Sequence, residues 1–299
     1  MDIRSDIREF LTTRRARLTP ADVGLPDFGG RRRVAGLRRE EVALLAGMSV
    51  EYYVRLERGN ASGVSDAVLD GIARALRLDA AERNHLHDLV RAADDGGVRR
   101  SRRSRARTQT IRPGMQQLIE AMHGVPAVVQ NGRLDVVAIN RLGRALFSEM
   151  LESPEQPPNF ARYLFLDERA RRFYRRWDDS AEQVVALLRS EAGRAPRDRE
   201  LSDLVGELAT RSDAFRTLWA SHDVREHRTG AKAITHPLVG DIDLSFEALD
   251  VSDERGLQLI AFTAAPGSAS SDALGLIASW VATSAEPVDG SARAGATDR

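Results

Sequence analysis

The sequence predicts two domains: an all-α domain of five helices, followed by an α+β domain with an antiparallel sheet. The chain has 299 residues, which is room for about two domains. Apolar residues recur with helical spacing throughout the first ninety residues. After residue 113, alternating strand-like runs are interspersed with long helical patterns. The predicted organisation is a helical domain over 1–93, a linker over 94–113, a second domain over 114–283, and a disordered tail over 284–299.

The first two helices of the helical domain are predicted from apolar spacing and a glycine stop. Ile7, Phe10 and Leu11 fall on one face of a helix over residues 4–17. A polar loop rich in Gly and Pro follows. A second helix is predicted over 39–46, and Gly47 ends it because glycine readily takes the left-handed conformation found just beyond helix ends.

The third, fourth and fifth helices are each marked by a capping residue. Ser49 caps a helix that ends at Gly59, and Ser65 caps the next. Asp79 and Glu82 have the D-x-x-E spacing of a capping box, in which each side chain accepts a hydrogen bond from the backbone of the other. These signals complete the five-helix prediction.

The linker and the first hairpin of the second domain follow. Residues 94–114 contain seven arginines and no large aromatic residue, so this stretch cannot form a core. Strand-like runs over 125–130 and 134–139 are joined around Asn131 and Gly132, a strong signal for a hairpin turn.

Helical patterns and three further strands complete the second domain. The helical patterns occupy roughly 159–222. Strands are predicted over 232–239 and 242–250, joined at Gly240 and Asp241, and over 257–264. The middle strand alternates apolar and polar residues, so one of its faces is buried. The last is apolar on both faces, as expected of a strand covered on both sides.

Charge is distributed unevenly between the two halves. The formal net charge is zero, yet residues 1–113 carry 23 Arg against 16 acidic residues, a balance of +7. The remainder therefore carries −7, which indicates that only the first half is suited to a polyanion. Of the 44 basic residues, only Lys232 is a lysine. The absence of cysteine excludes disulfides and cysteine-ligated metals.

Residues 37–60, LRREEVALLAGMSVEYYVRLERGN, have the pattern of two helices joined by a tight turn. Tyr53 and Leu56 of the second helix face inward, toward the first helix. The opposite face is free, and in such a unit the start of the second helix can reach base edges in the major groove. Arg39, at the start of the first helix, is placed to meet a phosphate. Spacing alone leaves open an ordinary helical hairpin.

Residues 4–93 resemble the XRE-type helix-turn-helix of phage repressors, in the bacterial branch called MmyB-like. The segments that match are GLRREEVALLAGMSVEYYVRLERG, the preceding GRRRVAGL and the run from Ile72 to Leu78. The resemblance implies that Glu57 pairs with an arginine of the first helix, for which Arg14 is the candidate. It also implies these DNA-binding residues: Arg39, Ser49, Val50, Glu51 and Arg55, with Tyr52 as a further candidate. Separately, the run of charge at Arg31, Arg32 and Arg33 could contact phosphates, although such a run is more commonly a solvated face.

Two of these roles stay open. Glu51 could accept a hydrogen bond from a cytosine amino group, or could simply favour the positive end of the helix dipole. Tyr52 could contact the DNA backbone or be a partly exposed ring.

The second domain resembles the C-terminal half of MmyB-like regulators, which is a PAS-like sensor enclosing a ligand cavity. The matching segments are NGRLDVVAIN (131–140), NFARYLFLD (159–167), FRTLWASHDVR (215–225) and FTAAPGS (262–268). At least one member of the family holds a long-chain fatty acid in this cavity. The chain departs from the family pattern at Ile139, where a tryptophan is common, and this leaves the pocket size open.

The supply of large apolar residues predicts a mostly apolar cavity sized for an acyl chain, although a solid core remains the alternative. Arg225, His222 and His236 are candidate donors to a carboxylate head group. The predicted lining comprises Val128, Val137, Ile139, Leu164, Phe173, Trp177, Phe215, Trp219, His222, Phe246 and Phe262.

The function predicted is sequence-specific DNA binding that regulates transcription and is modulated by a small lipophilic ligand, for which a fatty acid is the candidate. Alternatives are a second domain that binds a protein partner, or a DNA-targeted enzyme. No metal site is predicted, since neither His85 with His87 nor His222 with His227 lies on one helical face. No catalytic residues or cofactor are predicted, because the sequence contains none of the common catalytic or nucleotide-binding motifs. A homodimer on an operator is expected. The expected location is the cytoplasm, at the nucleoid when DNA-bound, with no membrane association.

Overall fold

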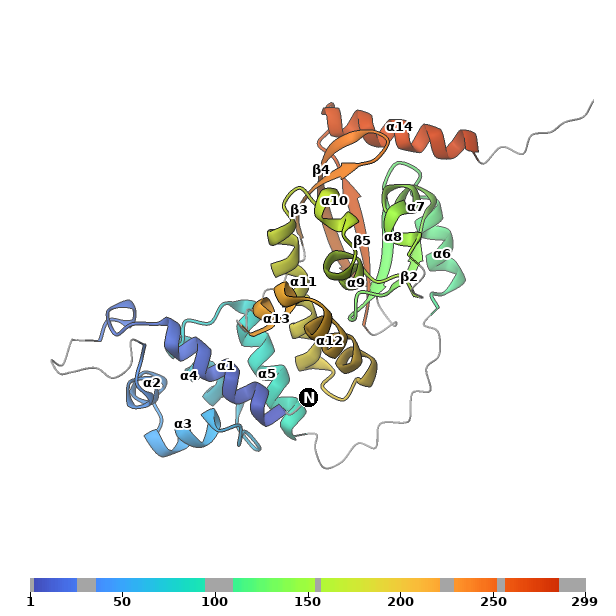
Figure 1. The fold of residues 1–299 in the computed structure, drawn as a ribbon. Helices are drawn as coiled ribbons and strands as arrows, with labels where there is room; N and C mark the ends of the chain where they lie inside the picture. The colour runs from blue at the N-terminus through green and yellow to red at the C-terminus, as the bar shows by residue number, and fades with distance from the viewer. Residues whose placement is uncertain are drawn as a thin grey trace, which may run out of the picture.

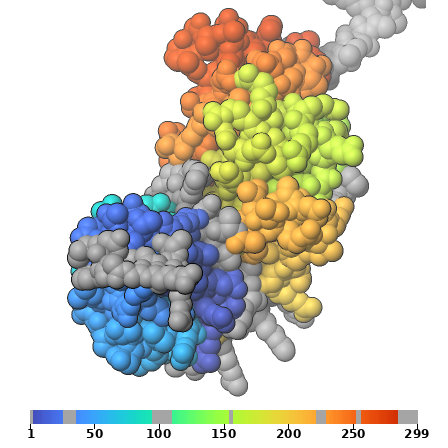
Figure 2. Space-filling view, turned by 60° about the vertical axis from the view of Figure 1, so that its left-hand side comes forward, coloured from blue at the N-terminus to red at the C-terminus, as the bar shows by residue number. Residues whose placement is uncertain are grey.

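The computed structural model describes residues 3–25, 36–94, 110–153, 157–220, 229–251 and 256–284. Within these ranges the chain has a helical N-terminal part and a C-terminal part with a five-stranded antiparallel sheet and helices (Figure 1). Figure 2 shows α1–α5 gathered into a lobe of their own, coloured from blue to cyan. Several predicted features lie outside the described residues: Arg31 to Arg33, His222, Arg225, most of the linker and nearly all of the tail.

The five predicted N-terminal helices are confirmed. Gly47 follows the second with a φ of +69°, and its N–H bonds the carbonyls of Ala43 and Leu44. The Ser49 hydroxyl accepts from the Tyr52 N–H at 3.2 Å, and the capping box of Asp79 and Glu82 closes at 3.1 and 2.8 Å. The bounds are α1 Ile3–Arg17, α2 Arg39–Ala46, α3 Val50–Glu57, α4 Asp66–Ala75 and α5 Ala80–Asp94, with a short 3-10 turn at Ala21–Val23.

One apolar core holds these helices together. Ile7 and Phe10 of α1, Val42 of α2 and Tyr53 and Leu56 of α3 are almost completely buried. Because a fully buried large apolar side chain contributes about 1.5–3 kcal/mol, this core is what orients α3 on α1 and α2.

The sheet has the strand order β2-β1-β5-β4-β3, and neighbouring strands are antiparallel. Its strands are β1 Ala127–Asn131, β2 Val136–Ile139, β3 Thr229–His236, β4 Gly240–Asp250 and β5 Leu257–Thr263. The helices are α6 Pro113–Glu120, α7 Arg141–Leu146, α8 Ser148–Leu151, α9 Phe160–Leu166, α10 Arg169–Phe173, α11 Trp177–Arg194, α12 Arg199–Arg211, α13 Asp213–Ala220 and α14 Ala269–Ser284.

The middle position of β5 explains why its sequence is apolar on both faces. Ile260 and Phe262 belong to the large core beneath α9 and α11, whereas Leu257 and Leu259 belong to a smaller core that includes Ile119 of α6. The predicted first hairpin is confirmed as β1 and β2.

The structure corrects one turn and adds helices α6, α7, α8 and α14, which lie outside the predicted helical segment. The turn between β3 and β4 is at residues 237–239, not at Gly240 and Asp241, because His236 pairs with Gly240 and Thr235 with Asp241 inside the ladder. Helix α14 was not predicted from the sequence. Its composition of small and apolar residues lacks the charged face that usually identifies a surface helix.

Candidate DNA-binding face and ligand cavity

Helix α3 presents an exposed face that begins at its first residue. Glu51 and Arg55 are exposed and Val50 is 40% exposed, while Tyr53 and Leu56 on the other face are buried. Tyr52 is partly buried, and the Arg55 guanidinium lies over its ring at 4.6 Å from the centroid. Tyr52 therefore supports the position of Arg55, and the two side chains form one surface.

A buried carboxylate connects the first three helices. Glu57 is only 2% exposed and accepts hydrogen bonds from Arg15 Nε at 2.7 Å and from Arg39 Nε. Arg15 also donates to the Leu37 carbonyl at 2.7 Å. The prediction that Arg14 pairs with Glu57 was wrong, because Arg14 Nε instead pairs with Glu82 Oε1 at 2.7 Å. Arg39 thus supports the α2–α3 unit while remaining half exposed.

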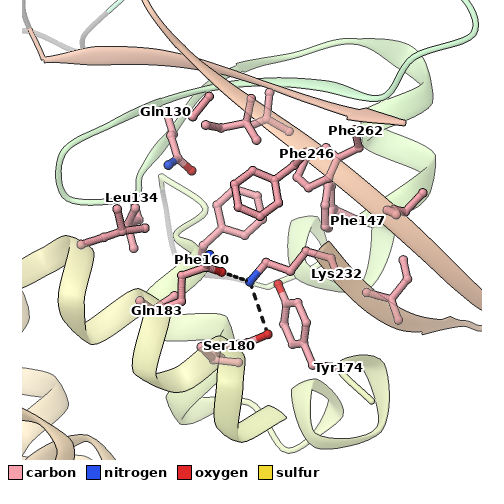
Figure 3. Close-up of a pocket in the computed structure, with 18 of the residues that line it drawn as sticks. Gln130, Leu134, Phe147, Phe160, Tyr174, Ser180, Gln183, Lys232, Phe246 and Phe262 are labelled. Atoms are coloured by element: carbon pink, nitrogen blue, oxygen red, sulfur yellow. Dashed lines mark hydrogen bonds between the residues drawn. The ribbon is translucent and has the colours of Figure 1, made fainter. Parts of the chain in front are cut away.

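The second domain contains a mostly apolar cavity between the inner face of the sheet and helices α9 and α11 (Figure 3). Strand β4 contributes Leu244, Phe246 and Ala248, the alternate residues that the sequence predicts to be buried. The cavity holds about 80 Å³ of free space. A cavity of about 150 Å³ is enough for one benzene molecule, so this one is not sized for a long acyl chain as it stands.

The predicted lining residues fall into three groups. Val128, Leu164, Phe246 and Phe262 line the cavity, and His222 lies outside the described residues. The others do not line the cavity: Ile139, Phe173, Trp177, Phe215 and Trp219 pack in or against the large core, and Val137 packs on the opposite face of the sheet.

Local contacts explain why some of these residues are held away from the cavity. Trp177 donates its indole N–H to the Leu164 carbonyl at 3.0 Å, and the rings of Phe215 and Trp219 stack at 5.5 Å. Both nitrogens of buried His236 are engaged: Nε2 is 3.1 Å from the Ala145 carbonyl, and Nδ1 accepts from the Leu238 N–H. His236 is therefore held by its own turn and by Ala145 of α7.

Lys232 is the polar centre of the cavity, and the sequence analysis missed it. Its Nζ contacts the Ser180 hydroxyl at 3.3 Å and the Gln183 side-chain oxygen (Figure 3). Burial lowers the pKa of the Lys232 ammonium to about 8, an effect that the charge of Asp179 opposes. The described residues that line the cavity include no carboxylate. The one signal available in the sequence was that Lys232 is the only lysine among 44 basic residues.

Helix α11 touches both the cavity and the helical domain. Its first half lines the cavity with Ser180, Gln183, Val184 and Leu187, whose spacing puts them on one face. Its last turn packs on α5, where Arg194 Nε lies 3.6 Å from Asp88 Oδ2. The wall of the cavity and the interface with the helical domain are therefore parts of one helix.

Comparison with known protein families shows which family this chain belongs to. The family model described as MmyB-like transcription regulator ligand binding domain matches residues 111–277, more than half of the chain. The chain belongs to the MmyB-like transcription regulators. A second family model, described as a helix-turn-helix domain, matches residues 6–86 of this MmyB-like regulator. No curated protein matches the sequence well enough to count as a relative.

The two matches coincide with the two sites described above. The helix-turn-helix match spans α2 and α3, and the ligand-binding match spans the sheet and the cavity. This MmyB-like chain is accordingly a DNA-binding transcription regulator with a ligand-binding domain. In the described ranges, no helix is long and apolar enough to cross a bilayer.

Proposed function

We propose that the chain is a sequence-specific, XRE-type regulator whose DNA affinity is set by a lipophilic ligand with an anionic head group, such as a fatty acid. The observation that carries this proposal is Lys232, an ammonium within a mostly apolar cavity in which no described lining residue is a carboxylate. A buried charge is costly unless it is paired. A ligand carboxylate would supply the missing charge.

The DNA-binding side of the proposal rests on the exposed face of α3. Val50, Glu51 and Arg55 would read base edges, because the start and exposed face of such a helix reach into the major groove. Ser49, Tyr52 and Arg39 would hold this face and contact the backbone. Arg31, Arg32 and Arg33 remain proposed phosphate contacts, outside the described residues.

The small volume of the cavity implies that an acyl chain must widen it. Phe147, Phe160, Phe246 and Phe262 surround the free space, and α11 closes one side. Protein interiors are close-packed, so added volume displaces whole elements as well as single side chains. Entry of a ligand would therefore shift α11 against the sheet.

A shift of α11 would reach the DNA-binding domain directly. The same helix packs on α5 through its last turn, and α5 packs on α1 and α4. A ligand that binds one arrangement of α11 and α5 better than another changes DNA affinity by that difference and no more. We infer that this contact is the route of regulation.

We also propose that two copies of the chain form a homodimer. A single helix-turn-helix domain covers a modest area of DNA, and proteins with this unit commonly read two half-sites about 34–36 Å apart. Leu276 and Trp280 of α14 are 63% and 55% exposed and offer an apolar surface for association. The protein would act in the cytoplasm, at the nucleoid when bound to DNA. Light scattering at micromolar concentration tests the dimer, and a monomeric mass contradicts it.

The ligand is tested by native mass spectrometry and thermal shift with saturated fatty acids of 10 to 18 carbons. We expect a bound acid and an increase in Tm, since a ligand that binds only the folded state stabilises it. 1-Tetradecanol is the matched control for tetradecanoic acid: it has the same chain length without the charge, and it should bind more weakly. Lys232→Met should remove the difference between the two compounds. Failure of every acid to bind would contradict the fatty-acid proposal.

A further inference from the structure

A groove of about 520 Å³ lies at the junction of the two domains, beside the recognition helix. It is lined by Arg55 of α3, Asn60 just after α3, Arg4 of α1, and Pro196 and Arg197 of the turn between α11 and α12. The described residues lining it include three arginines and no carboxylate. Figure 1 shows the α11–α12 turn beside the start of α1, marked N.

We propose that Arg197 binds a DNA phosphate, so that the ligand-binding domain forms part of the DNA-binding surface. The groove is continuous with the exposed face of α3 through Arg55. Most contacts that orient a protein on a duplex go to phosphates, and arginine is well suited to them because its guanidinium can donate two parallel hydrogen bonds. A backbone strand passing α3 would meet Arg197 next.

Arg197 is available for such a contact. Its side chain is exposed, and it forms no ion pair or hydrogen bond within the part of the chain that the structure describes. Its neighbours differ, since Arg194 faces Asp88 and Arg199 faces Asp203. An arginine that is not paired with an acid of its own chain can bind a polyanion without first breaking an ion pair.

The turn that carries Arg197 is held on both sides. Asp198 caps α12 through the Leu201 N–H at 3.1 Å and pairs with Arg133 at 3.0 Å. Its own N–H bonds the Ala195 carbonyl at 2.9 Å. Only the side chain of Arg197 remains to be ordered on binding, which lowers the entropic cost of the contact.

The position of the turn depends on the packing of α11 on α5. Pro196 and Arg197 follow α11 directly, and Ala92 and Ala93 at the end of α5 line the same groove. Movement of α11 would therefore move Arg197 relative to Arg55. The same movement would bring Arg197 and the recognition helix into or out of alignment with the DNA.

The test measures binding of the full chain to a 30-bp duplex of arbitrary sequence by fluorescence anisotropy from 50 to 400 mM KCl. Because each phosphate neutralised contributes about 0.9 to the slope of log K against log salt, Arg197→Ala should reduce the slope by about that amount and weaken binding several-fold at 50 mM. Arg197→Lys should retain the slope, because it keeps the charge.

Arg199→Ala is the matched control. It removes the same charge two residues along, from a side chain that is 92% exposed and lies outside the lining of the groove. It should leave the slope unchanged. Equal slopes for Arg197→Ala and Arg199→Ala would overturn the proposal, and tighter binding by Arg197→Ala would mean that the turn obstructs DNA. Arg55→Ala, compared on an operator duplex and a scrambled duplex, tests the recognition face independently of Arg197.

Discussion

Gly193 near the end of α11 lies directly against the His85 ring of α5. A Cβ atom on Gly193 would be 2.7 Å from both Cε1 and Nδ1 of that ring, closer than such atoms approach. Glycine is therefore required for the two helices to pack at this distance. The contact lies six residues beyond Leu187, the last residue of α11 that lines the cavity. The interface between the domains therefore tolerates little change in the position of the helix.

Gly193→Ala should separate ligand binding from DNA binding. The added methyl group pushes α11 from α5, while Lys232 and the cavity are left intact. Tetradecanoic acid should bind with unchanged affinity but should no longer change the affinity for DNA. Amide hydrogen exchange of α5 should also be faster in the variant, since the packing of α11 protects it.

Gly206→Ala is the control for that substitution. Gly206 is also within a helix, α12, and a Cβ there would meet nothing within 4 Å. Alanine should raise stability at that position by about 0.5–1 kcal/mol through its helix preference. Unchanged coupling in Gly193→Ala would show that the signal takes another route.

Binding of tetradecanoate should weaken as pH rises above about 8. In the free protein the Lys232 pKa is lowered to about 8 by burial. A bound carboxylate stabilises the ammonium and raises that pKa, so the complex holds the proton to a higher pH than the free protein does. Between the two pKa values the affinity falls up to tenfold per pH unit. Titration calorimetry from pH 6.5 to 10 measures this.

The same titration with Lys232→Met should be flat over this range. The Met side chain keeps the length and apolar character of the lysine stem without its charge. A pH dependence that persists in Lys232→Met would assign the effect to another group.

Arg55→Ala should weaken binding to the operator more than binding to scrambled DNA. A well-placed arginine on a base edge contributes about 1–3 kcal/mol of discrimination. Val50→Ala should act in the same direction with a smaller effect, because it removes only an apolar contact. Gel shifts on operator and scrambled duplexes measure the ratio. Equal operator binding by Arg55→Ala and the natural chain would mean that another face reads the bases.

Arg39→Ala should weaken binding to both duplexes about equally, as loss of a phosphate contact does. It also removes one of the two arginines that hold Glu57. Thermal unfolding therefore has to accompany the gel shifts, to separate lost contact from lost stability. A selective loss of operator binding would instead make Arg39 a base reader.

Glu57→Ala should be among the most destabilising substitutions in the helical domain. Removing one partner of a buried ion pair costs about 3–5 kcal/mol, because the other charge stays buried. Here Arg15 is only 12% exposed and loses its partner. Urea denaturation measures the difference, and Glu57→Gln, which keeps the hydrogen-bond acceptor, should cost less. Glu40→Ala removes an exposed acid nearby and serves as the control.

Features determined by neighbouring residues were predictable from the sequence. The ends of α2, α3 and α5 follow from Gly47, Ser49 and the capping box, whose bonds span only a few residues. The first hairpin was predictable from its turn residues, Asn131 and Gly132. Whether Tyr52 contacts DNA could not be predicted in this way, because its contact with Arg55 depends on side-chain rotation.

Features determined by distant residues were not predictable. Lys232 is surrounded by Ser180 and Gln183, about fifty positions earlier in the chain, so its burial depends on how α11 packs on the sheet. The partner of Glu57 was misassigned by one residue for a similar reason. Neighbouring positions on a helix point about 100° apart, and the docking of α1 decides which of Arg14 and Arg15 faces α3.

The central position of β5 has a consequence for the order in which the chain can fold during synthesis. Strand β1 pairs on one side with β2, a few residues later, and on the other with β5, about 130 residues later. The ligand-binding domain thus cannot close its sheet until β5 has left the ribosome, whereas the N-terminal helices make mostly local contacts and fold early. A chain that ends before β5 would still possess its recognition helix but would have no complete domain to regulate it.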